Sequence, residues 1–190
     1  TSEPNAVLSL SAASNNGYLR VHGAPADTAA KHQVDLGATA SSSFLTFSPS
    51  GSEKMRIDAL GNVGIGADNL SEKLEVNGNV KIKNALLSNQ ENTDIDSAAA
   101  EVVAQVAHAT YTAAFFDFVV KKGTNVRSGT VYACHNGDTT PLVEFTETST
   151  NDLGDTSDVT LSVDISGTNM RLLATVTSDD WSVKSLIRAI

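Results

Sequence analysis

Histidines are the first residues of this chain to consider for chemistry, because they bind metal ions and transfer protons near neutral pH. The 190 residues include four of them, at His22, His32, His108 and His135. They are scattered, and no His-x-His pair occurs. A lone histidine could still meet its symmetry copies on an axis and bind a metal ion, but we favour surface or hydrogen-bonded histidines. The sequence therefore predicts no metal site and no cofactor.

Carboxylates gather in the segment 151–158, which carries Asp152, Asp155 and Asp158. Calcium prefers oxygen ligands of this kind. The spacing lacks the Asp-x-Asp-x-Asp-Gly form of a dedicated calcium loop, so we favour ordinary turn chemistry by Asp and Asn.

Enzyme motifs are absent elsewhere. Gly61-x-x-Gly64-x-Gly66 reverses the spacing of a dinucleotide-binding loop, and no strand–helix–strand unit surrounds it. Ser, His and Asp are present without the sequence context of a nucleophilic triad. We therefore expect a protein that is not an enzyme.

Recognition is the remaining chemistry. Aromatic side chains dominate binding hot spots, and turn residues on a rigid sheet often contact a receptor. A single Trp at the start of a terminal strand is more often a core residue, and this alternative stays open. The residues that we assign to recognition are Tyr111, Asn136, Asp138, Asp179, Asp180 and Trp181.

Short β segments and turns must position these residues. Over residues 1–90, turn clusters such as Ser14–Gly17 and Ser48–Gly51 separate apolar runs of only a few residues. Strands this short cannot bury their own faces, which favours association with further copies, most plausibly as a homotrimer. Residues 91–97 are polar and acidic and are interpreted as a linker.

Residues 98–190 show clearer period-two alternation. Phe116, Phe118 and Val120 share one strand face, and Leu161 and Val163 alternate with polar residues. Turn signals recur every 8–15 residues, which is typical of an antiparallel sandwich or barrel.

Charge restricts the possible partners. The net charge is −9, and it is uneven: residues 1–90 carry 7 basic and 8 acidic residues, and residues 91–190 carry 6 and 14. An acidic surface disfavours nucleic acid and anionic lipid, and no apolar run is long enough to span a membrane. The one cysteine, Cys134, cannot form an intrachain disulfide. The chain does not begin with Met, and we expect it to be part of a longer protein.

The segment MRIDALGNVGIGADNLSEKLEVNGNVKI, from Met55 to Ile82, resembles a motif of bacteriophage tail fibres and related virion proteins. The resemblance implies a trimeric β-structured shaft. Glycines would permit positive φ and the close approach of three backbones, and short aliphatic residues would fill a shared core. These residues are Gly61, Gly64, Gly66 and Gly78, and Val63, Ile65, Leu74 and Val76.

The C-terminal half resembles, more weakly, a β-rich domain at the ends of some marine-phage fibres, through FFDFVVKKGTNVRSGTV and DTSDVTLSVDISGTNMRLLAT. The Ser-Asp-x-Arg-Leu-Lys signature of a self-cleaving chaperone is absent, so the resemblance implies a distal knob. The predicted fold is therefore all-β: a short-strand trimeric shaft over 1–90, a linker over 91–97 and an antiparallel, jelly-roll-like sandwich over 98–190.

The function that these resemblances imply is attachment of a phage virion to the host-cell surface through a trimeric receptor-binding tip. The expected partners are two further copies of the chain, other phage tail proteins and a receptor that is a glycan or an outer-membrane protein. The alternative is a purely structural fibre or head-fibre protein whose C-terminal domain drives trimerisation. A polysaccharide depolymerase is disfavoured, because such enzymes use a long β-helical groove.

Overall fold

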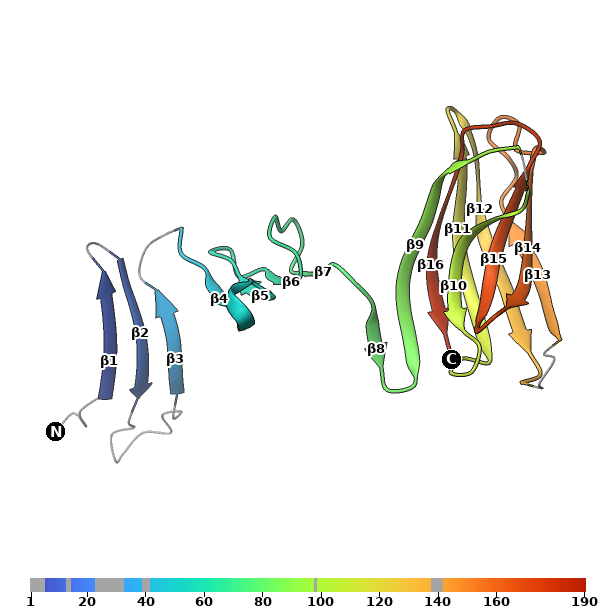
Figure 1. The fold of residues 1–190 in the computed structure, drawn as a ribbon. Helices are drawn as coiled ribbons and strands as arrows, with labels where there is room; N and C mark the ends of the chain where they lie inside the picture. The colour runs from blue at the N-terminus through green and yellow to red at the C-terminus, as the bar shows by residue number, and fades with distance from the viewer. Residues whose placement is uncertain (1–5, 13–14, 23–32, 39–41, 98, 138–141) are drawn as a thin grey trace. The chain divides into compact units, whose positions relative to one another are not determined.

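The computed structural model describes residues 6–12, 15–22, 33–38, 42–97, 99–137 and 142–190, with side chains at Leu36 and from Ser42 onward. Strands dominate these ranges, and they contain no α-helix (Figure 1). Within them, no helix has the length and apolarity needed to cross a bilayer. The chain divides into an N-terminal unit, Thr1–Asn77, and a C-terminal unit, Gly78–Ile190. The predicted all-β class is confirmed.

The N-terminal unit contains two small sheets. The first is an antiparallel meander of β1 (Ala6–Ala12), β2 (Asn15–His22) and β3 (Gln33–Ala38). The second has the order β4-β5-β6-β7, in which only the β6–β7 pair is parallel. Its elements are β4 (Leu45–Phe47), the 3-10 turn η1 (Pro49–Gly51), β5 (Met55–Ile57), β6 (Val63–Ile65) and β7 (Leu74–Val76).

Polar residues of the Met55–Ile82 motif build the turn between β5 and β6. One carboxylate oxygen of Asp58 accepts hydrogen bonds from the backbone N–H groups of Leu60 (2.9 Å) and Asn62 (2.8 Å). The amide of Asn62 donates to the other oxygen (3.0 Å), and Lys73 Nζ donates to the Leu60 carbonyl (2.8 Å). Short side chains of this type replace backbone partners in tight turns, so the motif specifies a local turn within one chain.

The apolar residues predicted for a shared shaft core are incompletely covered in one chain. Val63 and Val76 are half-buried, and Ile65 and Leu74 are 44% and 61% exposed. Homotrimer formation itself stays a prediction. Gly61 and Gly66 adopt the expected positive φ. Gly64 instead lies in β6, where the Ala67 carbonyl and the Leu70 side chain leave no room for a Cβ.

The C-terminal unit is a sandwich of two antiparallel sheets (Figure 1). The larger sheet has the order β13-β12-β11-β16-β9-β8, and the smaller has the order β10-β15-β14. This division into six and three strands departs from an eight-stranded jelly roll. The strands are β8 (Val80–Ile82), β9 (Ala85–Ile95), β10 (Glu101–Ala107), β11 (Ala113–Lys122), β12 (Asn125–His135), β13 (Val143–Ser149), β14 (Val159–Ser166), β15 (Asn169–Val176) and β16 (Trp181–Ala189).

One hydrophobic core fills the space between these sheets. The predicted inward residues Phe116, Phe118 and Val120 of β11 are buried, and they face Leu161, Leu172 and other residues of the smaller sheet. Burying such side chains contributes about 1.5–3 kcal/mol each. The alternation in the sequence therefore identified this core correctly.

The boundary between the units differs from the predicted one. Residues 91–95, interpreted as linker, belong to β9, which pairs with β16 from Leu86↔Ala189 to Ile95↔Trp181. The division falls at Asn77/Gly78. The segment is polar because one face of β9 is solvent-exposed, and Ile95, its one large apolar residue, is fully buried.

Candidate functional site

Four connections meet at one end of the C-terminal unit, which we call the acidic loop end: the β9–β10, β11–β12, β13–β14 and β15–β16 connections (Figure 1). Hydrogen bonds join them. Ser97 N–H donates to Asp179 Oδ1 (2.8 Å), and the side chain of Ser178 donates to Asp158 Oδ2 (2.6 Å). The backbones of Val126 and Leu153 also pair. Antiparallel hairpins bring these loops together although they are distant in sequence.

Carboxylates outnumber cations at the acidic loop end, where Lys122 and Arg127 are the bases that contact the loops. The aspartates in and beside the loops are Asp94, Asp96, Asp152, Asp155, Asp158, Asp179 and Asp180. A surface of this charge attracts hydroxyl and amino donors and repels phosphate.

Lys122 links β11 to the β15–β16 turn. Its Nζ donates to the Asp179 carbonyl (2.6 Å) and to Ser178 Oγ (3.1 Å), and it lies 5.6 Å from the centre of the Trp181 ring. Trp181 is 1% exposed, and its indole N–H donates to Ser178 Oγ (3.1 Å). The turn is therefore attached to the core on which it lies.

Hydrogen bonds to these carboxylates favour their charged form. Donation by Ser178 and Thr177 lowers the pKa of Asp158, with a smaller contribution from the charge of Lys122. The backbone N–H of Ser97 lowers the pKa of Asp179. The side chain of Ser157 lowers the pKa of Asp155. These three groups are ionised at neutral pH and help to order the loops.

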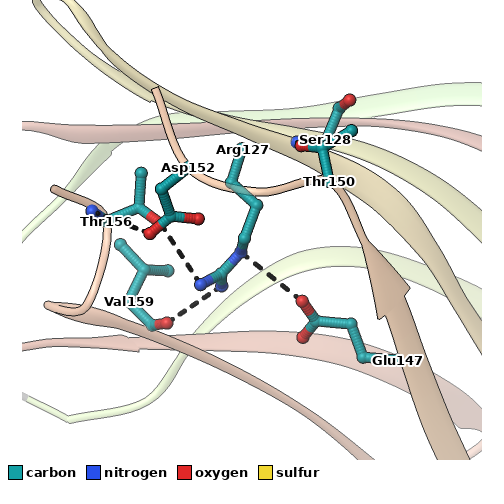
Figure 2. Close-up of polar contacts among 7 residues, drawn as sticks. All are labelled: Arg127, Ser128, Glu147, Thr150, Asp152, Thr156 and Val159. Atoms are coloured by element: carbon teal, nitrogen blue, oxygen red, sulfur yellow. Dashed lines mark hydrogen bonds and ion pairs between the residues drawn. The ribbon is translucent and has the colours of Figure 1, made fainter. Parts of the chain in front are cut away.

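Arg127 holds the β13–β14 loop against β12 (Figure 2). Its guanidinium donates to Thr156 Oγ1 (3.3 Å) and to the Val159 carbonyl (3.0 Å), and its Nε lies 3.4 Å from Glu147 Oε1. Thr156 is fully buried and donates through its hydroxyl to Asp152 Oδ2 (2.5 Å). These hydrogen bonds therefore attach the β13–β14 loop, which carries the aspartates, to β12.

Three exposed carboxylates, from Asp94, Asp96 and Asp180, bring oxygen atoms within 4.8 Å of one another. Asp180 has a left-handed backbone (φ 63°), and its N–H donates to Asp96 Oδ1 (3.3 Å). The interpretation of residues 91–97 as a linker separated Asp94 and Asp96 from Asp180. The pairing of β9 with β16 brings them beside Asp180.

The residues predicted for recognition do not form one site. Asp179 and Asp180 are exposed at the acidic loop end. Asn136 is exposed at the opposite end, where it accepts the Leu142 N–H (3.1 Å), and Asp138 lies outside the described residues. Tyr111 and Trp181 are 7% and 1% exposed and belong to the core. Both aromatic residues must therefore be removed from the candidate contact surface of this chain.

The histidines whose side chains are described have protein partners. Nε2 of His135 donates to the Tyr111 carbonyl (2.9 Å), and Nδ1 accepts the Gly137 N–H (3.0 Å), so the ring fits the neutral tautomer. His108 Nε2 lies 3.3 Å from the Gly167 carbonyl, and the two rings meet edge to face. The side chain of His22 and all of His32 lie outside the described part.

Comparison with known proteins identifies no family for this chain. No family model matches the sequence, and no curated protein matches it. Among solved structures, the chain is similar to the tailspike protein of Acinetobacter baumannii phage AM24, with a TM-score of 0.37 and 11% identity. The match covers 56% of this chain and 26% of the tailspike chain, so the chain spans about a quarter of that protein. These values are too low for an inference about function.

Proposed function

We propose that the chain is the distal segment of a bacteriophage tail fibre, a homotrimeric virion component that attaches the phage to the host-cell surface. The observation that carries the proposal is the Met55–Ile82 motif, which resembles fibre shafts and whose strands β6 and β7 leave Ile65 and Leu74 exposed in a single chain. Large apolar side chains on three-residue strands gain free energy when copies of the chain cover them.

The acidic loop end supplies the proposed contact with the receptor. Its loops carry carboxylate acceptors on a rigid sandwich, as is common for binding surfaces. Carboxylates suit the hydroxyl or amino groups of a glycan, or a basic patch on an outer-membrane protein. Three such ends would raise the avidity without tight binding at any single end. Binding without catalysis is proposed, since no catalytic arrangement is assigned to this end.

Competition for adsorption tests this proposal. Purified trimer is expected to reduce phage adsorption to its host, and the double variant Asp179→Ala/Asp180→Ala is expected to compete less well. Thr168→Ala, in the β14–β15 turn at the opposite end, is the matched control and should compete like the wild type. A monomeric solution mass, or no competition by wild-type protein, would contradict the proposal. Release of reducing sugar ends from host polysaccharide would instead indicate a depolymerase.

A second candidate is a structural fibre protein whose C-terminal unit drives assembly. The apolar outer surface of the six-stranded sheet, described below, favours it. A chain lacking residues 78–190 separates the two functions. If that chain still trimerises but no longer competes, the C-terminal unit serves binding. Loss of the trimer indicates a role in assembly.

A further inference from the structure

The outer face of the six-stranded sheet carries several large apolar side chains that are exposed in a single chain. We define this outer face as the side chains that point away from the core on β8, β9, β16, β11, β12 and β13, which alternate with the buried residues of those strands. Five large ones are between 37% and 65% exposed: Ile82, Leu87, Val119, Tyr132 and Leu186. Such patches usually mark an interaction site.

Two apolar hollows lie on this face, and Phe115 lines both. One, of about 410 Å³, is bordered by Phe115, Tyr132, Cys134 and Glu144. The other, of about 390 Å³, is bordered by Ile82, Leu87, Phe115 and Arg188. The rings of Phe115 and Tyr132 meet edge to face at 5.9 Å, and the Arg188 guanidinium lies 5.0 Å from the centre of the Phe115 ring. The hollows could receive side chains from a partner.

The distribution of charge over the C-terminal unit favours a second copy of the chain as the partner. Residues 78–190 contain 8 basic and 14 acidic residues, a net charge of −6. Away from the acidic loop end, the outer face carries three basic and three acidic residues, so the net charge of this part of the face is zero. These are Lys121, Lys184 and Arg188, and Glu91, Asp117 and Glu144.

Two pairs are already joined within the chain: Arg188 Nε lies 3.1 Å from Asp117 Oδ2, and Lys184 Nζ lies 2.9 Å from Glu91 Oε2. Two acidic copies therefore meet without net repulsion on this face, whereas the acidic loop ends repel one another.

We propose that the outer face is the surface through which C-terminal units of identical chains pack together. This interface adds detail to the proposed function. It rests on the proposed function, which supplies the assembly of copies around a common axis. Six strands about 4.8 Å apart and strands of roughly nine residues give this face on the order of 600–700 Å². Stable interfaces bury about 1,200–2,000 Å² in total, or about 600–1,000 Å² per partner, so the area of this face reaches the lower end of that range.

Cys134 is a built-in reporter of this interface. It is the one cysteine of the chain, it is exposed in a single copy, and it borders the first hollow. In the assembled 190-residue chain, we expect a maleimide to label Cys134 about tenfold more slowly than in a variant that cannot pack through this face, because the thiol reacts only from free chains. The guanidinium-unfolded chain gives the fully accessible rate.

Leu186→Glu and Val119→Glu place a charge at the centre of the face, on side chains that are 43% and 41% exposed. Each variant is expected to restore fast labelling at the protein concentration that protects the wild type. Thr175→Glu adds the same charge to an exposed position of β15, on the smaller sheet, and should leave Cys134 protected. Fluorescence of the buried Trp181 checks that each variant is folded.

The outcomes separate this interface from the proposed function. Fast labelling of wild-type Cys134 in a protein of trimeric mass overturns the outer-face interface and leaves the homotrimer standing. Protection that persists in both Leu186→Glu and Val119→Glu also overturns it. Protection that both variants abolish supports the interface, even if the protein fails to compete for adsorption, which would contradict attachment alone.

Discussion

Gly64 is the residue whose backbone environment is most restrictive in the N-terminal unit. It is buried in β6, and an added Cβ would meet the Ala67 carbonyl and the side chain of Leu70. Gly64→Ala is therefore expected to destabilise the N-terminal unit by about 1–3 kcal/mol, as overpacking does. Hydrogen exchange of amides in residues 55–76 should accelerate.

Gly61→Ala is the matched comparison, because open space surrounds that position and the cost comes only from its φ of +76°. We expect about 1 kcal/mol from this backbone cost alone. If Gly64→Ala exchanges like the wild type, the close contact around Gly64 is not a constraint. Positive φ and three neighbouring chains were the reasons predicted for all four motif glycines, but Gly64 is required by contacts within its own chain.

Asp158 makes the acidic loop end sensitive to acid. Its pKa is lowered by hydrogen bonds from Ser178 and Thr177, so the ionised form stabilises the fold. A group with a lowered folded pKa contributes stability above its unfolded pKa, near 3.9, and loses it as the pH falls through the folded pKa. We expect urea midpoints to decrease as the pH falls from about 5 to below about 3.9, and the decrease to be smaller in Asp158→Asn.

Ser178→Ala checks the cause, because it removes the first donor to Asp158 but keeps the carboxylate. Its acid-induced decrease should lie between those of the wild type and Asp158→Asn, because Thr177 still donates to the carboxylate. Identical pH profiles for the wild type and both variants would show that these hydrogen bonds do not couple the loop end to folding.

At the scale of elements, Arg127 connects β12 to β13 and to the start of β14. Its side chain is 13% exposed and that of Glu147 is 26% exposed, so solvent screens the ion pair only partly. Arg127→Ala also leaves the Thr156 hydroxyl and the Val159 carbonyl without this donor. We expect a loss of about 2 kcal/mol in the free energy of unfolding, measured by urea denaturation.

Arg171→Ala is the control for this prediction. Arg171 pairs with Asp164 on the smaller sheet, where the side chains are 25% and 39% exposed. Removing a surface pair of this kind should cost less than about 1 kcal/mol. Equal losses in the free energy of unfolding for the two substitutions would mean that the contacts of Arg127 with the β13–β14 loop contribute no more than a surface ion pair.

Period-two alternation allowed several of these elements to be predicted. Phe116, Phe118 and Val120 identified β11 and its buried face, because side-chain direction follows directly from local sequence. Trp181 was left open between the core and a contact surface, and its burial together with that of Val183 and Ile187 on the same face of β16 shows that this face is the core. The acidic loop end was missed because Asp96 and Asp180 approach only through the long-range pairing of β9 with β16.

At the scale of the whole molecule, the sequence showed an acidic C-terminal half but not its distribution in space. The strand register separates that charge into an acidic loop end and a neutral outer face. Neither surface corresponds to a contiguous segment, so neither could be recognised from composition. The pairing of β9 with β16 also places the N-terminal limit of the C-terminal unit before β9.

A fragment of residues 78–190 is expected to fold by itself, whereas residues 98–190, the unit predicted from sequence, are not. The shorter fragment lacks β9, which leaves β16 with an unpaired edge and removes the fully buried Ile95. An open edge and a missing core residue together cost several kcal/mol, a large part of the stability of a domain this size. Urea denaturation followed by Trp181 fluorescence should show a cooperative transition for 78–190 alone. A cooperative transition for 98–190 would mean that the C-terminal unit folds without β9. The positions of Asp94 and Asp96 at the acidic loop end would then not be fixed by the folding of this unit.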